Sequence, residues 1–551
     1  MERNLTKYIG IVLVLLSSFF AIKSLLGSGY FPVHDSLQVE RIYEMASAIK
    51  DGQFPVRWVY DLGYGYGYPL FNFYGPLPYY IGAFFNIVGL SLVVSAKLMF
   101  GIGILISGIS MYLLGKEIWG KVGGIISAVL YVYLPYHAVQ IYVRGAVGEY
   151  YAYALLPLLV LSFLKLNSKR VEKWIFIGGL TYSGIILSHN ISAMLITMLV
   201  LIYMFTYGLI VRRINKSQVT VLLIGLCLSA FFWMPAVTEN NFTQVNKVVG
   251  GGSYYGDHFV EPWQLWSSVW GYAGSAPMSE QDGMSFKLGK VHIITALVAL
   301  VWVLYKRDKK YYPLLAILTL LFIGSVFMML PISKNIWDRL PPLKYVQFPW
   351  RLLMYAGFAL SVIAGGVSMV VQKYRLGMVL VAVIFILVTV NVRALPKLEL
   401  LHFMPSEYYL LDDEAITSDH NLRWLKSEKS DEYLPKYFFQ PQREEDISLR
   451  RVNFDADITE DRSNLLKFNI TALEIAEISM DIAYFPGWKG YVDGKEVPVK
   501  RLTRGISITV PTGAHNVMLR LENTPVRTLA NLTSVISLGV LLVLLVKYAK
   551  S

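Results

Sequence analysis

His34 and Asp35 stand side by side just after the first long apolar run of the chain, in the stretch GYFPVHDSLQVERI at residues 29–42. A carboxylate just outside a membrane-spanning segment can bind an acceptor hydroxyl at the membrane surface. It would act there as a general base or help to hold a divalent cation. An ordinary hydrated carboxylate at a helix end is an equally weighted alternative. We take Asp35 and His34 as the candidate catalytic residues, and Asp35 as the ligand if a metal is bound.

Arg144 and Glu149 lie in the stretch YVRGAVGEYYA, in a turn between two apolar runs. Arg144 is the single basic residue of a turn that the charge pattern described below places outside, where basic residues are disfavoured. A phosphate group would explain it, because guanidinium pairs well with phosphate oxygens. The alternative is an ion pair between Arg144 and Glu149 that braces the turn.

Two further polar stretches lie near outer helix ends. In SHNISAM, His189 and Asn190 form an almost loopless turn, for which a helix cap is slightly favoured over contact with a ligand. In YVQFPWRLL, Arg351 begins a helix, either as a second phosphate ligand or as a snorkelling arginine in an aromatic belt. We therefore expect Arg144 and Arg351 to bind a donor phosphate, with His189, Asn190 and Glu149 as candidate substrate contacts.

Several other kinds of site are not indicated. There is no G-x-x-x-x-G-K-[ST] phosphate loop and no cysteine–histidine zinc spacing, and the single cysteine, Cys227, lies inside an apolar run. The glycine-rich stretch GYGYGYP at 63–69 alternates with tyrosine, which favours an aromatic turn near sugar or lipid head groups. No cofactor is expected with certainty, and a divalent cation remains open.

The elements that must position these residues are membrane helices. Of 551 residues, 55% are hydrophobic and 16% charged, and the mean hydropathy is +0.48. Soluble proteins have roughly 25% charged residues. Crossing a bilayer takes roughly 17–25 apolar residues, and about twelve runs approach or reach that length. They lie at residues 8–26, 92–115, 122–140, 149–164, 174–188, 191–211, 217–236, 291–305, 311–331, 350–371, 376–393 and 528–546.

Basic residues set the orientation. If both termini are cytoplasmic, every inside loop carries lysine or arginine, as the positive-inside rule requires. The basic residues behind the net charge of +12 then orient the protein in the membrane, and a nucleic-acid partner is not needed to explain them. We interpret the first run as a retained helix and not a cleaved signal peptide. The aromatic segment 74–91 is either interfacial, which we favour, or a further span.

Three domains follow from this pattern. Residues 1–393 form a transmembrane domain with external loops at 27–91 and 237–290. Residues 394–527 are polar, with alternating stretches such as GISITV and a hairpin signal at Asp493-Gly494, which predicts an extracytoplasmic β-sandwich. Residues 528–551 form the final transmembrane helix and a cytoplasmic tail.

The order of these parts resembles the GT-C superfamily of polytopic glycosyltransferases, whose members place a functional aspartate in the first external loop and use polyprenyl-phosphate sugars. Within that group the chain is most similar to the bacterial membrane proteins called 6-pyruvoyl-tetrahydropterin synthase-related. No pterin chemistry is inferred from that name. Four stretches carry the resemblance: FPVHDSLQVERI, YVRGAVGEYYA, QFPWRLL and YFPGWKGYVDGKEV.

The resemblance gives Asp35 the role of the superfamily's loop aspartate. Some relatives have paired acidic residues there, where this chain has His34. It implies an inverting glycosyltransferase in the bacterial plasma membrane that moves a sugar from a polyprenyl-phosphate donor to an envelope glycan or polymer on the outer face. The alternatives are a non-catalytic lipid-linked glycan transporter and an envelope-assembly scaffold. Transporters usually carry polar residues at mid-bilayer, whereas here the spans are nearly free of charge apart from Lys97.

Overall fold

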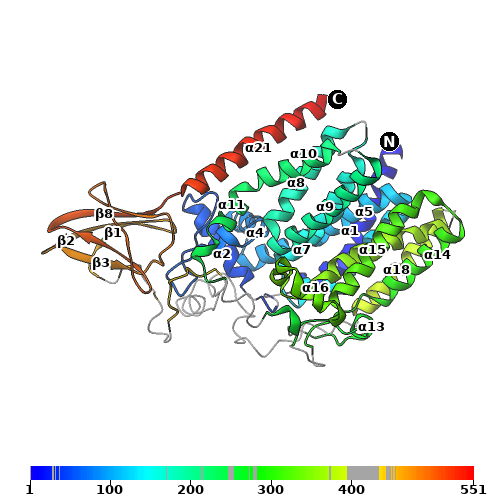
Figure 1. The fold of residues 1–551 in the computed structure, drawn as a ribbon, viewed down its shortest axis with the longest axis horizontal. Coiled ribbons are helices and arrows are strands. Elements are labelled where there is room, and N and C mark those ends of the chain that lie inside the picture. Colours follow the sequence, from blue (N-terminus) through cyan, green and yellow to red (C-terminus); the bar gives the residue numbers. More distant parts are fainter. Residues whose placement is uncertain are drawn as a thin grey trace.

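Helices dominate the computed structural model, and the strands lie together beyond one end of the helical bundle (Figure 1). The last helix runs from the strands along the outside of the bundle, and the two chain ends lie at the end opposite the strands. The structure describes residues 2–27, 30, 33–35, 37–168, 170–212, 215–245, 253–271, 274–276, 282–371, 374–393, 433–441, 448, 451–452 and 454–550.

The α-helices, in chain order, are α1 (Glu2–Ile22), α2 (Gln38–Lys50), α3 (Leu70–Phe73), α4 (Leu77–Ile87), α5 (Leu92–Val132), α6 (Pro135–Tyr142), α7 (Val147–Lys165), α8 (Val171–Ser188), α9 (Asn190–Val211), α10 (Lys216–Leu228), α11 (Ala230–Thr238), α13 (Gln264–Ser267), α14 (Lys290–Tyr305), α15 (Tyr312–Met329), α16 (Lys334–Arg339), α17 (Leu353–Ala364), α18 (Tyr374–Arg393) and α21 (Pro525–Lys550). A short 3-10 helix, η7 (Pro349–Leu352), contains Arg351.

Within the described residues, six helical segments are long and apolar enough to cross a membrane, and the bent pair α10–α11 would make a seventh. Three shorter apolar helices lie at Asn190–Thr206, Lys290–Tyr305 and Arg375–Val390. The membrane character of the chain is therefore as expected, while the count of twelve spans stays a prediction.

Helix α5 contains two of the expected spans. Its backbone leaves helical geometry at Gly120, where φ is 79°. The two halves then lie against each other, because a Cβ added to Gly115 would be 3.0 Å from the Cα of Gly124, and one on Gly124 would be 2.9 Å from the carbonyl oxygen of Tyr112. A left-handed conformation is open to glycine at little cost, so this residue permits a tight reversal.

The second of these spans ends earlier than predicted. The apolar run at 122–140 is not one helix, because α5 ends at Val132 and α6 begins at Pro135. A proline disfavours helical geometry in the residue before it and fits the first helical position. Leu134 accordingly has φ −59° and ψ 130°, outside the helical region.

The run at 217–236 is also broken. Helices α10 and α11 meet at Ser229 and differ in direction by 71°. The Ser229 hydroxyl donates to the carbonyl oxygen of Gly225 at 2.7 Å, a local bond that competes with the helical pattern. Hydropathy alone shows the run but not the bend.

The segment 27–91, which the sequence predicts as an external loop, is a packed part of the molecule in its described residues. Nine residues of α2 are buried, among them Glu40, Arg41 and Glu44. Helix α4 has 11 residues and so rises about 16 Å, against a bilayer core of roughly 30 Å. Segment 74–91 is therefore too short in its helical part to be a further span.

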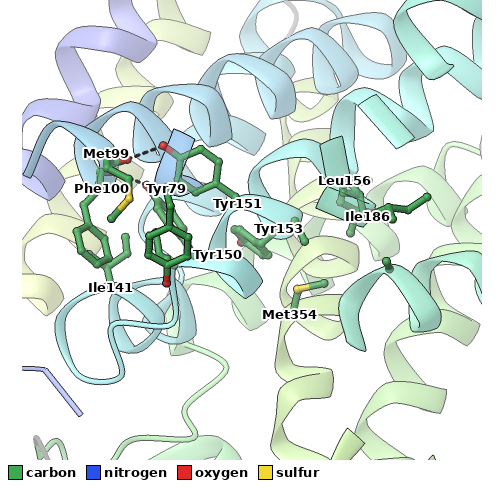
Figure 2. Packing of buried hydrophobic residues seen from close by; sticks show 14 of the residues in the cluster. Tyr79, Met99, Phe100, Ile141, Tyr150, Tyr151, Tyr153, Leu156, Ile186 and Met354 are labelled. Carbon is green, nitrogen blue, oxygen red and sulfur yellow. Dashed lines mark hydrogen bonds between the residues drawn. The ribbon is translucent and has the colours of Figure 1, made fainter. Parts of the chain in front are cut away.

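Tyrosines join α7 to α5 inside the bundle. Figure 2 shows Tyr150 and Tyr151 donating to the carbonyl oxygens of Phe100 and Met99, each at 2.6 Å. Buried tyrosine needs a partner for its hydroxyl, and away from water a helix carbonyl supplies one. These bonds fix the start of α7, where Glu149 lies.

The strands form two antiparallel sheets in residues 457–521. One has the order β1 (Asp457–Arg462), β2 (Leu465–Ala472), β8 (Gly513–Leu521), β4 (Trp488–Val492) and β5 (Lys495–Val497). The other has the order β3 (Ala476–Met480), β7 (Ile506–Val510) and β6 (Lys500–Arg501). A Cβ on Gly490 of β4 would lie 2.9 Å from the Cγ2 atom of Ile508 in β7, so the sheets touch there. Residues 394–432 of the expected domain lie outside the described residues.

The predicted turn at Asp493-Gly494 is confirmed. Val492 pairs with Lys495, and the two residues between them have φ values of 49° and 78°. Two successive positive φ values are typical of the type I′ hairpin turn, which asparagine or aspartate followed by glycine favours.

The orientation in the membrane can be tested by cysteine labelling of intact cells. In a Cys227→Ser background, a cysteine at Lys495 in β5 should react with an impermeant maleimide, and a cysteine at Lys309, between α14 and α15, should react only after permeabilisation. Both positions are exposed, so access to the reagent and not burial decides the result. The opposite pattern would invert the topology.

Candidate functional site

Asp35 lies beside Arg144 because two distant segments pair along their backbones. The amide of His34 donates to the carbonyl of Val143, and the amide of Asp35 donates to that of Arg144, each at 2.8 Å. Close approach is possible because Gly145 follows: it has φ 64°, and a Cβ there would be 2.6 Å from the Cγ2 atom of Val33. Two stretches that the sequence singled out separately therefore form one structure.

The Asp35 carboxylate is held from the protein side. Arg41 Nη1 lies 3.0 Å from both of its oxygens, and the Tyr74 hydroxyl donates to Oδ2 at 3.2 Å. Arg41 is buried whereas the Asp35 side chain is 28% exposed. Burial by itself would lower the pKa of Arg41, but Asp35 and the nearby tyrosines raise it above its usual value. Asp35 is thus fixed by a permanent cation, with part of its surface open.

Glu149 is the most buried of the candidate site residues, at 2% exposure. It lies in the first turn of α7, where the helix dipole favours negative charge. Its carboxylate meets Arg144 Nη1 at 2.9 Å and Arg351 Nε at 3.3 Å. It also accepts from the Tyr136 hydroxyl and, at 3.0 Å, from Gln140 Nε2. The ion pair that was an alternative explanation of Arg144 is therefore present.

Arg351 reaches Glu149 from η7, far along the chain. Its Nη1 also donates to the carbonyl of Val346 at 2.6 Å and to Gln347 Oε1 at 3.1 Å. The Arg144 guanidinium lies over the Trp350 ring, 4.5 Å from its centre. One carboxylate thus faces two arginines.

His189 caps α9, and a helix cap was the slightly favoured interpretation of this turn. Its Nδ1 accepts the amide of Ser192 at 3.2 Å. Burial, and then the positive charge of Arg351, lowers the pKa of His189 to about 3, so the ring is neutral at physiological pH. Next to it, Asn190 Nδ2 donates to the carbonyl of Phe73 at 2.8 Å and ties α9 to α3.

A cavity of about 310 Å³ lies beside Arg351 and His189. Of the expected residues, His189, Asn190 and Arg351 line it. Tyr74 also lines it and carries the contact to Asp35. The remaining lining residues include Phe73, Gly75, Met194, Gln347 and Tyr433.

Four expected residues do not line the cavity, namely Asp35, His34, Arg144 and Glu149. Arg144 and Glu149 lie behind Arg351 and reach the cavity through it. His34 is exposed, and its Nε2 lies 3.4 Å from the place of a Cβ on Gly274. Asp35 bonds to Arg144 through the backbone, and Arg144 shares Glu149 with Arg351, while the role of each residue stays a prediction.

Sequence reasoning missed Arg41 and Tyr74. Arg41 lies six residues after Asp35 in the same quoted stretch, but nothing in the spacing shows that α2 turns this side chain inward. Tyr74 belongs to the aromatic segment that was interpreted only as a membrane contact. Both are identified by their contacts with Asp35, which come from the fold.

The residues around Asp35 do not by themselves fit a cation. Among the residues that the structure describes, no group of three or more histidine, cysteine, aspartate or glutamate side chains lies together. The oxygens of Asp35 already face Arg41.

The family model for the 6-pyruvoyl-tetrahydropterin synthase related domain, described as a membrane protein, matches residues 71–401. The chain belongs to this family. The match begins just before Tyr74 and contains α4 to α18, so it includes the Arg144–Glu149–Arg351 cluster but not Asp35. The family expected from the sequence is thereby confirmed.

A relative in Lactococcus lactis subsp. cremoris (strain MG1363), an uncharacterized protein, is 26% identical over 208 residues, which is 35% of this chain and 34% of the relative. Among solved structures, this family member is similar to an oligosaccharyltransferase from Archaeoglobus fulgidus, with 15% identity, a TM-score of 0.49, and coverage of 82% of this chain and 62% of that one. The arabinofuranosyltransferase AftD from Mycobacteria gives 14% identity, a TM-score of 0.40, and coverage of 72% and 27%. The chain therefore spans less than two thirds of each.

Replacing Glu149 with Gln should destabilise the protein strongly. The change removes the buried carboxylate that meets both Arg144 and Arg351, and breaking a buried pair costs about 3–5 kcal/mol. The free energy of unfolding can be measured by SDS titration of the purified protein in mixed micelles. As a matched control, Glu117→Gln removes a carboxylate that is 43% exposed and paired with Lys165, which should cost about 0–1 kcal/mol. Equal losses of unfolding free energy in the two variants would show that the Glu149 cluster stabilises the protein no more than an exposed ion pair does.

Proposed function

We propose that this protein is a membrane glycosyltransferase of the GT-C kind, which moves a sugar from a polyprenyl-phosphate donor to a cell-envelope acceptor on the outer face of the plasma membrane. The observation that carries this proposal is the cavity that has Arg351 in its wall and reaches Asp35 through Tyr74. A cationic wall suits a phosphate leaving group, and a nearby carboxylate suits an acceptor hydroxyl. An inverting transfer needs both on opposite sides of the reacting carbon.

The donor phosphate is expected at Arg351. That guanidinium lines the cavity and shares the carboxylate of Glu149 with Arg144, so two positive charges lie close together next to the cavity. Fixed positive charge placed where negative charge develops lowers the barrier, because no reorganisation is needed during the reaction. In this proposal Arg351 contacts the phosphate and Arg144 supports it from behind.

The acceptor is expected at Asp35. Its carboxylate takes the proton of the acceptor hydroxyl, the acceptor oxygen forms a bond to the anomeric carbon, and the bond from that carbon to the phosphate oxygen breaks. The electron pair leaves with the polyprenyl phosphate, whose charge Arg351 stabilises. Arg41 and Tyr74 are positioning residues, since they hold Asp35 in place. His189, being neutral, can donate or accept a hydrogen bond but brings no charge.

The wider arrangement belongs to the same proposal. The proposed topology has about twelve spans, cytoplasmic termini and an extracytoplasmic β-sandwich. It would put the cavity at the outer surface of the plasma membrane, where the donor arrives from the bilayer. The β-rich region would bind the acceptor glycan or cover the site. A lipid-linked glycan transporter and an envelope scaffold are the competing functions, and both predict that Asp35 is dispensable for sugar transfer.

Asp35→Asn should abolish most sugar transfer, measured per folded protein because the change also removes the counter-charge of the buried Arg41. The change keeps size and hydrogen bonding but removes the base, and general base catalysis contributes typically 10²–10⁴-fold. Transfer from a short-chain polyprenyl-phosphate sugar to envelope acceptor, measured in proteoliposomes, should fall by roughly two or more orders of magnitude. Donor binding should be largely kept. Asp455→Asn, at an exposed aspartate before β1, is the control and should behave as wild type. Full activity in a well-folded Asp35→Asn protein would remove Asp35 from the mechanism.

Arg351→Lys should weaken donor binding. Lysine keeps the charge but loses the planar fork, and with it at least one charge-assisted hydrogen bond. We expect the Kd for a short-chain polyprenyl-phosphate sugar to rise roughly tenfold, which corresponds to about 1.4 kcal/mol. Arg375→Lys, at an exposed arginine at the start of α18, is the matched control. Unchanged affinity in Arg351→Lys would make this arginine purely structural.

A further inference from the structure

A second cavity, of about 380 Å³, lies where the turn after α2, the end of β8 and the start of α21 meet. Three arginines line it, Arg57, Arg520 and Arg527, together with the amide side chains of Asn464 and Asn523. It shares no lining residue with the cavity next to Asp35. The proposed sugar transfer does not use this second cavity.

Arg57 brings a positive charge that its neighbours do not neutralise. Its side chain is buried, and its Nη1 and Nη2 donate to the neutral amide oxygens of Asn72 at 2.9 Å and Asn531 at 2.8 Å. Its Nε is buried and has no hydrogen-bond partner among the described residues. Burial, and then the charge of Arg527, lowers the pKa of Arg57 to about 10, which still leaves it charged at neutral pH. A buried charge of this kind is unfavourable unless a counter-charge joins it.

The nearby carboxylates are already engaged. Glu239 pairs with Arg527, whose Nη2 and Nε lie 2.9 and 3.0 Å from its Oε2. Glu522 lines the cavity but accepts the Tyr491 hydroxyl at 2.8 Å and lies 3.8 Å from Lys489.

Arg520 adds to the excess of positive charge. It is exposed on β8 directly opposite Lys489 of β4, and within the described part of the chain it forms no ion pair. Three arginines and Lys489, which also pairs with Glu496 at 3.1 Å, thus carry four positive charges against the three of Glu239, Glu522 and Glu496, which leaves one uncompensated.

The residue types indicate what the ligand is. Guanidinium groups bind phosphate oxygens in a planar, bidentate way, and several around one cavity favour a phosphate over a neutral polar group. Helix α21 begins at Pro525, between the lining residues Asn523 and Arg527, and the start of a helix favours an anion.

The surroundings indicate where the ligand comes from. Phe54 lines the cavity and is 82% exposed, and α21 shows exposed Leu529 and Leu532 one and two turns further on. An exposed aromatic ring above an apolar helix is typical of the membrane interface. The cavity is therefore at the level expected for lipid head groups.

We propose that Arg57, Arg520 and Arg527 form a second anion site, which binds a phosphate group. Its place at the start of an apolar helix favours the phosphodiester of a membrane lipid over a phosphate in solution. The site is independent of the proposed transfer reaction.

Binding of phosphatidylglycerol to the full-length protein in detergent, titrated by native mass spectrometry, tests this. Arg520→Gln is the main variant, because Arg520 is exposed and its loss should not disturb folding. It should weaken binding about tenfold, the effect of losing one charge-assisted hydrogen bond. Lys495→Gln removes one exposed charge from the same sheet away from the cavity and should leave binding unchanged. Diacylglycerol, which has no phosphate, should not bind to the site.

A second arm separates the two sources of phosphate. If glycerol 1-phosphate binds as tightly as phosphatidylglycerol, and Arg520→Gln weakens both, the site takes a phosphate from solution and the assignment of a phosphate site holds. Phosphatidylglycerol alone binding tightly would identify a lipid site. Equal loss in Arg520→Gln and Lys495→Gln, or no binding of either phosphate probe, would overturn the proposal. Sugar transfer can be intact in any of these cases, so the result does not depend on the proposed function.

Discussion

A carboxylate that is almost wholly buried at the start of a membrane helix must be neutralised where it lies, and in this protein Glu149 is neutralised by two arginines. Removing a charge from water is costly unless the partner is close and the remaining oxygens accept hydrogen bonds. Arg144 comes from the turn before α7, Arg351 from η7, and Tyr136 and Gln140 from α6. Each of these elements is therefore fixed relative to α7 by one side chain.

The same cluster connects stability with chemistry. Two guanidinium groups meet one carboxylate, and the cavity lies on the Arg351 side of this cluster. Like charges held close together repel each other in a medium of low dielectric, and an anionic group in the cavity would stabilise them. The residues that brace α7 are therefore also the ones that we propose to hold the leaving phosphate.

The sequence predicted those features of the structure that depend on a local pattern of residues. The membrane helices follow from apolar runs, the hairpin at Asp493-Gly494 from residues suited to positive φ, and the family from quoted stretches. The breaks were missed although Pro135 signals one of them, because an apolar run continues across it. Arg41 was missed for a different reason: an arginine on an amphipathic helix is usually exposed, and only the packing of α2 turns this one towards Asp35. Contacts between segments far apart, such as Asp35 with Arg144, have no signature in the spacing.

Helix α3 shows how the two cavities are joined in the fold. It has four residues, and a single turn has too few internal hydrogen bonds to be stable by itself. Asn72 within it accepts from Arg57 of the arginine-lined cavity and donates to Glu239 at 2.9 Å. The next residue, Phe73, lines the cavity near Asp35 and accepts from Asn190. The position of α3 is therefore set by the polar groups on its two sides. Arg57 and Asn190 thus bond adjacent residues of one short turn, which fixes the walls of the two cavities relative to each other.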